Sequence, residues 1–99
     1  MTSDATLYLI SNGTATGASF YWPGGRGTFM ADATFAGGTV KLQVQMPSLT
    51  TSTWIDVGTE CTLTAAGLGN FELPPCNLRA FVSGSPTGIY AVAAGTRID

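Results

Sequence analysis

The chain has 99 residues, enough for one domain, and it is rich in glycine and poor in charge, with 13 glycines and charged side chains at only 10% of positions. Four Lys and Arg residues against six Asp and Glu residues give a net charge of −2, and the cations are scattered singly, which argues against nucleic acid as a partner. No run reaches the roughly 18 apolar residues of a membrane span, so no membrane partner is expected.

The sparse charge itself carries information. Charged residues make up about 25% of a typical soluble domain, so most of this surface must consist of Thr, Ser, Gly, Ala and apolar atoms. One interpretation is a neutral β surface rich in Thr and Ser. The other is that neighbouring subunits cover much of the surface, because few ionic groups then lose their water when two surfaces meet.

The first third of the chain predicts a flexible N-terminal arm followed by strands. The arm is residues 1–5, which are small and polar. A strand is expected over 6–11, and it should end at Asn12-Gly13, a dipeptide typical of tight turns. Residues 14–22 lead into a run of three aromatic side chains, and Pro23-Gly24-Gly25 ends that strand.

The clearest element covers residues 39–46, where apolar and polar side chains alternate strictly. Such alternation predicts a half-buried strand with one face in water. A strand over 27–34 precedes it, and Ala36-Gly37-Gly38 between them is typical of a hairpin connection. Residues 77–83 alternate again, with Arg79 and Phe81 on the face opposite Leu78. Further strands are expected at 53–57, 60–64, 70–73 and 89–94.

About eight short antiparallel strands with turn signals every 8 to 12 residues predict an all-β fold. We expect residues 6–99 to form a single small β-sandwich of jelly-roll or immunoglobulin-like topology. The expected core residues are Leu7, Leu9, Val40, Leu42, Val44, Ile55, Val57, Phe71, Leu73, Leu78, Val82 and Val92.

Catalytic and metal-binding constellations are scarce in this sequence. The chain has no histidine, so it lacks the usual general base and the usual partner of a Ser or Cys nucleophile. Asp56 and Glu60 are the one carboxylate pair that could serve a glycosidase, although solvated turn carboxylates are the simpler interpretation. Neither a zinc site nor a calcium loop can be assembled, so we expect no cofactor, no metal and no enzyme activity.

The two cysteines are expected to be free thiols. The N-terminus lacks the basic and apolar regions of a signal peptide, which predicts synthesis and folding in a cytoplasm. Thiols stay reduced there, so Cys61 and Cys76 should be partly buried and unpaired. A bridge between them is possible only if the strands bring their Cα atoms within about 7 Å.

Aromatic side chains are the best candidates for a binding surface. In Phe20-Tyr21-Trp22 at least one ring should face outward, because adjacent strand residues point to opposite faces. The pattern favours Trp54 as the core tryptophan of the sandwich, but it could instead lie on the surface and stack on a sugar. The candidate interface residues are Phe20, Tyr21, Trp22, Arg26 and Trp54.

Four short phrases lie along the middle of the chain: Gly-Thr-Val-Lys-Leu-Gln at 38–43, Thr-Trp at 53–54, Leu-Pro at 73–74 and Arg-Ala-Phe-Val at 79–82. With these phrases about half of the chain, residues 38–84, resembles small virion proteins of tailed phages. The resemblance implies a capsid decoration or cement protein of β-sandwich fold. It would bind the major capsid protein on the outside of the lattice as a dimer or trimer, and it would reside in the virion after synthesis in the host cytoplasm.

Two alternatives stay open beside this interpretation. The first is a carbohydrate-binding or receptor-binding module that uses Tyr21, Trp22 or Trp54. The second is another accessory subunit of a phage head or tail.

Overall fold

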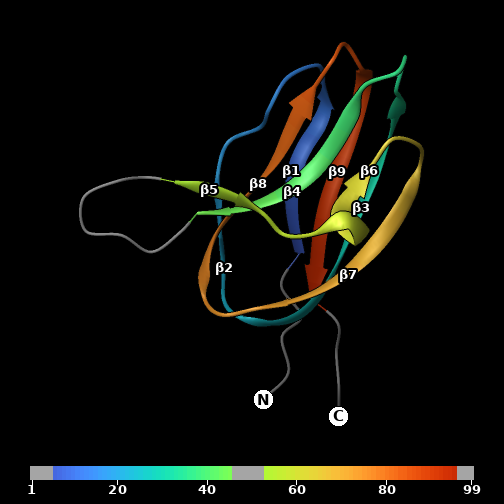
Figure 1. Cartoon of the computed structure of the whole chain (residues 1–99). Coiled ribbons are helices and arrows are strands. Elements are labelled where there is room, and N and C mark those ends of the chain that lie inside the picture. Colours follow the sequence, from blue (N-terminus) through green and yellow to red (C-terminus); the bar gives the residue numbers. More distant parts are fainter. Residues whose placement is uncertain (1–5, 46–52, 96–99) are drawn as a thin grey trace.

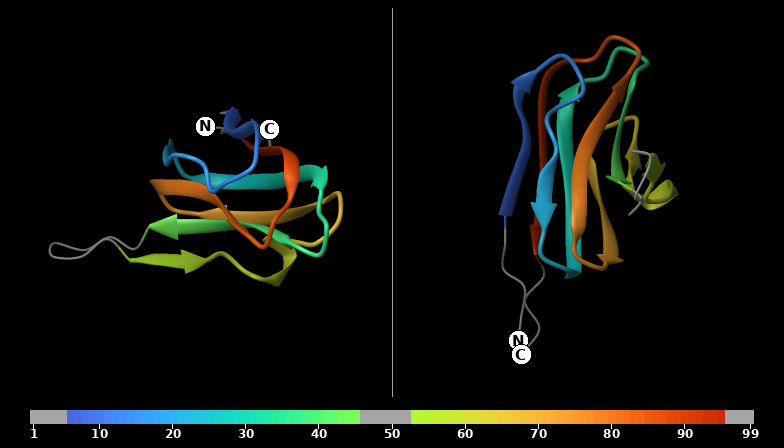
Figure 2. Two further views of the ribbon diagram at one scale, coloured as in Figure 1. Left: turned by 90° about the horizontal axis from the view of Figure 1, so that it is seen from above. Right: turned by 90° about the vertical axis from the view of Figure 1, so that its left-hand side faces the viewer.

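The computed structural model describes residues 6–45 and 53–95, and these form two antiparallel β-sheets packed face to face (Figure 1). Sheet A has the strand order β1-β9-β3-β7, with bounds Thr6–Gly13, Thr87–Gly95, Gly25–Thr34 and Gly67–Leu73. Sheet B has the order β2-β8-β4-β5, with bounds Phe20–Trp22, Cys76–Ser83, Thr39–Gln45 and Trp54–Asp56. Figure 2 shows the sandwich from two further sides.

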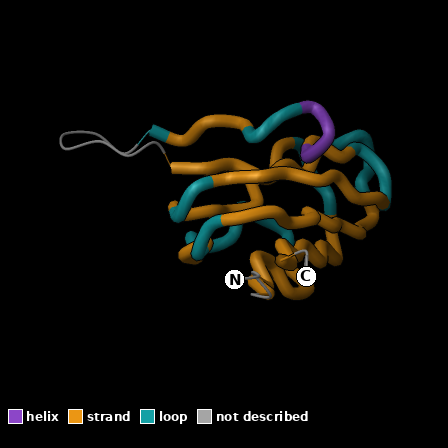
Figure 3. Tube along the Cα trace, turned by 90° about the horizontal axis from the view of Figure 1, so that it is seen from below, coloured by secondary structure: helices purple, strands orange, loops and turns teal. Residues whose placement is uncertain are grey.

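One edge of sheet B is an interrupted strand. β5 pairs with one end of β4, and β6 (Thr62–Leu63) pairs with the other end. Between them lies the 3₁₀ turn η1 (Thr59–Cys61), which is the helical segment among the described residues (purple in Figure 3). The nine strands therefore occupy eight positions, four in each sheet.

The strand order identifies a jelly roll. No two strands that pair in sheet A are consecutive in sequence, and in sheet B consecutive strands pair only where β4 meets β5. Almost every connection thus crosses from one sheet to the other, as in the double Greek keys of a jelly roll. In an immunoglobulin-like sandwich more strands would pair with their sequence neighbours. The predicted β-sandwich is confirmed, and its jelly-roll form is the one observed.

Two predicted turns have other roles. Asn12 has a φ of 58°, but it lies inside β1, where the register against β9 shifts between Ser11 and Gly13. Its left-handed backbone therefore forms a β-bulge and not a hairpin turn. Ala36-Gly37 does form a tight turn, closed by a 2.6 Å hydrogen bond from Gly38 N to Phe35 O, but it joins β3 in sheet A to β4 in sheet B. The predicted hairpin is therefore wrong, because the turn links two sheets.

The core lies between the two sheets, and most of its predicted members are confirmed. Those that are fully or largely buried are Leu9, Val40, Leu42, Phe71 and Leu78. Those that pack against them while partly buried are Leu7, Val44, Val57, Leu73 and Val82. The prediction missed Trp22, Phe29 and Ile89, which are among the largest fully buried side chains.

Two predicted core residues lie elsewhere. Ile55 is 45% exposed, because β5 is a three-residue edge strand that packs mainly on β4 and lies at the rim of the core. Val92 points outward from sheet A, since its neighbours Ala91 and Ala93 are the residues that enter the core. The predicted arm, the tail 96–99 and most of the loop 47–53 lie outside the described residues.

Candidate interaction surfaces

The five candidate interface residues do not come together. Trp22 is completely buried and packs edge-on against Phe71, with ring centroids 5.1 Å apart, so it is the core tryptophan. Phe20 lies on the same side of β2 at the edge of the sandwich, and Tyr21 points outward from sheet B with 63% of its surface exposed. As predicted, at least one ring of the run therefore faces outward.

The other two candidates lie on opposite faces of the molecule. Trp54 is on the outer face of sheet B, opposite Gln45 in the register, so its predicted place in the core is wrong. Arg26 is on the outer face of sheet A, opposite Glu72. A single interface cannot contain both side chains, and each face needs its own description.

Sheet B presents a group of side chains that we call the sheet B platform, comprising Lys41, Gln43, Trp54, Asp56, Arg79 and Phe81. Alternation in β4 turns Lys41 and Gln43 outward, since Val40 and Leu42 between them are buried. The register then sets Gln43 directly between Asp56 of β5 and Arg79 of β8. Two consecutive strands and the more distant β8 thus build one surface.

Hydrogen bonds tie the sheet B platform together. Gln43 Nε2 donates to Asp56 Oδ1 over 2.9 Å, and Arg79 Nε donates to Gln43 Oε1 over 2.9 Å. Lys41 Nζ lies 3.0 Å from Asp56 Oδ2. Gln43 is only 7% exposed, so its amide is a covered link whose donor and acceptor are both used.

Aromatic rings complete the platform. The guanidinium carbon of Arg79 lies 4.3 Å from the ring centroid of Trp54 and 5.5 Å from that of Phe81. Lys41 Nζ lies 5.3 Å from the Phe81 centroid. These are cation–π distances, and they hold Arg79 between two rings while Gln43 fixes its Nε. The alternation in 77–83 predicted that Arg79 and Phe81 share the face opposite Leu78, but it did not predict the contact of Arg79 with Trp54.

The platform also bears on the carboxylate pair considered for a glycosidase. Hydrogen bonds from Gln43 and from Lys41 lower the pKa of the Asp56 carboxyl below its ordinary value of 3.8. Asp56 is therefore ionised at neutral pH and engaged as an acceptor, which does not suit a general acid. Glu60 lies in η1 and lines a hollow of about 340 Å³ beside β7.

The outer face of sheet A has a different character. One outward residue from each strand falls in a single row across the sheet, which we call the apolar row: Tyr8, Val92, Met30 and Leu68. The register pairs Tyr8 with Val92, Val92 with Met30, and Met30 with Leu68. Tyr8 is 67% exposed and Leu68 61%. No single segment contains this row, because the four strands are separated in sequence.

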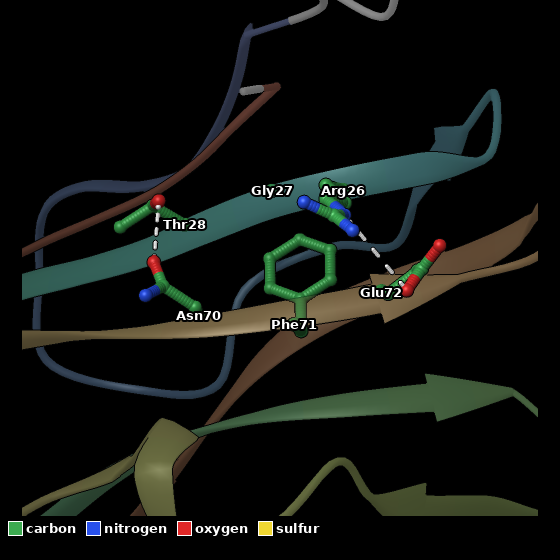
Figure 4. Close-up of a pocket in the computed structure, with 6 residues that line it drawn as sticks. All are labelled: Arg26, Gly27, Thr28, Asn70, Phe71 and Glu72. Atoms are coloured by element: carbon green, nitrogen blue, oxygen red, sulfur yellow. Dashed lines mark hydrogen bonds and ion pairs between the residues drawn. The ribbon is translucent and has the colours of Figure 1, made fainter. Parts of the chain in front are cut away.

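A hollow of about 500 Å³ lies between β3 and β7 at one end of sheet A (Figure 4). Its polar side chains pair with each other. Thr28 Oγ1 donates to Asn70 Oδ1 over 2.9 Å, and Arg26 Nε lies 4.0 Å from Glu72 Oε1. Phe71 is buried. A ligand here would compete with these side-chain pairs and would meet a buried ring, so this hollow is a weaker candidate than either face.

Within residues 6–45 and 53–95, no three His, Cys, Asp or Glu side chains gather in a way that could hold a metal ion. No helix in the same part of the chain is long and apolar enough to cross a membrane. Cys61 and Cys76 are both buried and free, as predicted. Burial, with a smaller contribution from Glu60, raises the pKa of Cys61 to about 11, and burial raises the pKa of Cys76.

Comparisons with known proteins give limited information. No family model matches this chain, and no curated protein matches it. Among solved structures, a chain in the structure of infectious bursal disease virus Gt strain is 15% identical, with a TM-score of 0.40 over 95% of this chain and 30% of that chain. A chain from the Gx strain gives 16% identity, the same TM-score and the same coverage. This protein thus spans less than a third of those virus chains, and at such a TM-score the jelly-roll assignment depends on strand order alone.

Proposed function

We propose that this chain is a structural virion protein that binds the outside of a tailed-phage capsid lattice and cements neighbouring capsomers. The binding surface in this proposal is the sheet B platform, and the partner is the major capsid protein. The observation that carries the proposal is Arg79 held between Trp54 and Phe81 on the outer face of a small jelly roll. Such a role needs no catalytic residue and no cofactor.

The chemistry of the platform is that of a protein interface. Trp, Tyr and Arg are the side chains that most often dominate the free energy of protein association, and Trp54, Arg79 and the nearby Tyr21 supply all three. The hydrogen bond to Gln43 already orders Arg79, so little side-chain entropy would be lost on binding. The resemblance of residues 38–84 to phage virion proteins covers β4, β5 and β8, the strands that build this platform.

The cementing effect in this proposal is a consequence of the law of mass action. A protein that binds the assembled lattice and not its separate subunits stabilises the assembly by an amount that grows with its concentration over its dissociation constant. At 100 times that constant, the stabilisation is about 2.7 kcal/mol for each site. Sparse charge reduces the desolvation cost of covering so much surface.

The test uses phage capsids prepared without this protein. Added wild-type protein should bind them and raise their heat-release temperature. Trp54→Ala should weaken binding about 30-fold, the effect of losing an interface residue worth roughly 2 kcal/mol. Ile55→Ala is the matched control, since Ile55 is exposed on the same strand but on its opposite side, and it should bind like the wild type. Absence of wild-type binding would refute the proposal.

A second candidate function is supported by the same surface. Trp54 and Phe81 offer aromatic rings beside the half-exposed carboxylate of Asp56, a combination that also suits a sugar or a glycosylated receptor. Titration of tryptophan fluorescence with a panel of polysaccharides distinguishes the two. Saturable sugar binding that Trp54→Ala abolishes, without capsid binding, would favour the carbohydrate-binding module. Labelling of intact virions in electron micrographs would separate a capsid location from another position on the head or tail.

A further inference from the structure

The outer face of sheet A is uncovered in the single chain, and it collects large apolar side chains. Of the seven large hydrophobic residues that are exposed in the described part of the chain, Tyr8, Met30, Leu68 and Tyr90 lie on this face. Three of them belong to the apolar row, which crosses all four strands. A contiguous apolar patch of this kind on a soluble protein is characteristic of a contact surface.

We propose that this face binds the same face of a second copy of the chain and forms a two-fold symmetric dimer. An antiparallel sheet is efficiently covered by another sheet of the same twist, at a spacing of about 10 Å and with the mean strand directions within about 30° of each other. The second copy supplies a sheet of identical size and twist. Two-fold dimers are also the commonest closed assemblies, because one patch serves both partners.

The central strands make this face self-complementary when the two-fold axis runs parallel to the strands, between β9 and β3. Each β9 then lies over the partner's β3. Val92 packs on the partner's Met30, since the two residues are level in the register. Two residues away on the same strands, Tyr90 pairs in register with Asp32. In the dimer, the Tyr90 hydroxyl can therefore donate a hydrogen bond to the carboxylate of the partner's Asp32. Each of these contacts occurs twice.

The charged side chains on the outer face of sheet A lie where the dimer would not bury them without a partner. Arg26 and Glu72 pair with each other at one end of the face, and their side chains are 61% and 71% exposed. Arg26 lies four residues before Met30 on β3, and Glu72 lies four residues after Leu68 on β7, so both lie outside the apolar row. The one carboxylate close to the row is Asp32, and the arrangement gives it the Tyr90 hydroxyl as a partner. Among the described residues of this face, the arrangement brings no like charges together across the interface.

The available area fits a modest but specific dimer. Four strands spaced about 4.8 Å apart and some 25 Å long give a face of roughly 500 Å² on each copy. Two such faces bury about 1,000 Å² in total, which reaches the lower limit for a specific interface. The interface lies on the opposite side of the sandwich from the sheet B platform, so it does not depend on what that platform binds.

The oligomeric state of the full chain in solution tests this proposal. Light scattering coupled to size exclusion should show a dimer for the wild type at concentrations on the order of 10 µM. Leu68→Asp should raise the dissociation constant of the dimer at least about 100-fold, because it places an unpaired carboxylate inside the apolar row. Tyr8→Ser should weaken the dimer in the same direction.

A matched control separates this face from general surface effects. Tyr21→Ser removes a tyrosine of nearly equal exposure from the opposite sheet, 63% against 67% for Tyr8, and it should leave the dimer intact. Fluorescence of the buried Trp22 reports whether each variant is folded. Tyr90→Phe and Asp32→Asn should each weaken the dimer several-fold, and together no more than either alone, if the two groups pair across the axis.

Three results would overturn the proposal. One is a wild type that stays monomeric at about 100 µM, a concentration at which even a weak dimer would form. Another is a folded Leu68→Asp variant that dimerises like the wild type. The third is loss of the dimer in Tyr21→Ser with retention in Tyr8→Ser. A monomeric wild type whose Leu68→Asp variant loses capsid binding would assign this face to the capsid instead.

Discussion

At the scale of single residues, Gly27 decides how closely the two sheets approach. It is buried in β3 and faces the core between two aromatic rings. A Cβ at this position would lie 2.6 Å from Phe71 Cζ and 2.8 Å from Trp22 Cη2. The rings pack edge-on in the space that a side chain would need, so glycine here is a packing requirement.

We therefore expect Gly27→Ala to lower the free energy of unfolding by about 1–3 kcal/mol, the usual cost of overpacking a core. Urea unfolding monitored by tryptophan fluorescence measures the change. Gly67→Ala is the control, because its nearest neighbours beyond the adjacent residues lie 3.8 Å from the added Cβ, and it should stay within about 0.5 kcal/mol of the wild type. Equal losses in both variants would contradict this explanation.

The tryptophans show what residue patterns reveal and what they leave open. We expected Trp54, which lies in a short strand, to be the core tryptophan, yet the core tryptophan is Trp22. Each tryptophan has neighbours in its strand that are compatible with either the core face or the solvent face of a sheet. What decides between them is which side of each strand meets the opposite sheet, and that depends on partners far away in the chain.

At the scale of elements, strands with strict alternation were predicted best. The strand expected over 39–46 is observed as Thr39–Gln45, with its apolar face inward. The two strands expected over 53–57 and 60–64 are observed as the shorter Trp54–Asp56 and Thr62–Leu63, with η1 between them. The alternation gave the shared face of Arg79 and Phe81, but the apolar row and the contacts across the sheet B platform could not be derived, because they join strands such as β4 and β8 that are far apart in sequence.

The segment between β1 and β2 illustrates how an irregular element can serve a sheet. Gly17 N donates to Ala80 O over 3.2 Å, and Val82 N donates to Thr16 Oγ1 over 3.0 Å. These bonds continue the path of β2 along β8, although β2 itself has only three residues. The segment thereby covers part of an edge that would otherwise expose unpaired backbone groups.

Thr16→Val tests this cover, because it keeps the shape of the side chain and removes the acceptor. We expect the free energy of unfolding to fall by about 1–2 kcal/mol, since the amide of Val82 is left without a partner. Hydrogen exchange at that amide should accelerate. Thr14→Val, at an exposed position of the same segment, should change neither quantity, and an equal effect there would argue against the hydrogen bond as the cause.

At the scale of the whole molecule, the sandwich separates two surfaces of different chemistry. Sheet B carries charged and aromatic side chains linked by hydrogen bonds, and sheet A carries the apolar row. The shared core fixes the distance between them. A substitution on the outer face of one sheet can therefore be tested without altering the outer face of the other sheet.

The two thiols report on the integrity of the whole sandwich. Cys61 and Cys76 are buried in different elements, and their raised pKa values leave little reactive thiolate at pH 8. We expect negligible labelling by a thiol reagent in the native protein and labelling of two thiols once urea unfolds it, with both transitions at the same urea concentration as the loss of circular dichroism. Intact mass before reduction should show no bridge. Rapid labelling of one thiol at full native signal would mean that its region opens separately.

The pairing of the first described strand with the last has a practical consequence. Thr6 lies opposite Ala94, and β1 begins where β9 ends, at one end of the sandwich (right-hand view of Figure 2). A short linker could therefore join these two points, and new termini could be opened in a surface turn such as Ala36-Gly37. A passenger protein fused at this end would project along the strands, clear of both outer faces, which would make the chain a carrier for displaying other domains.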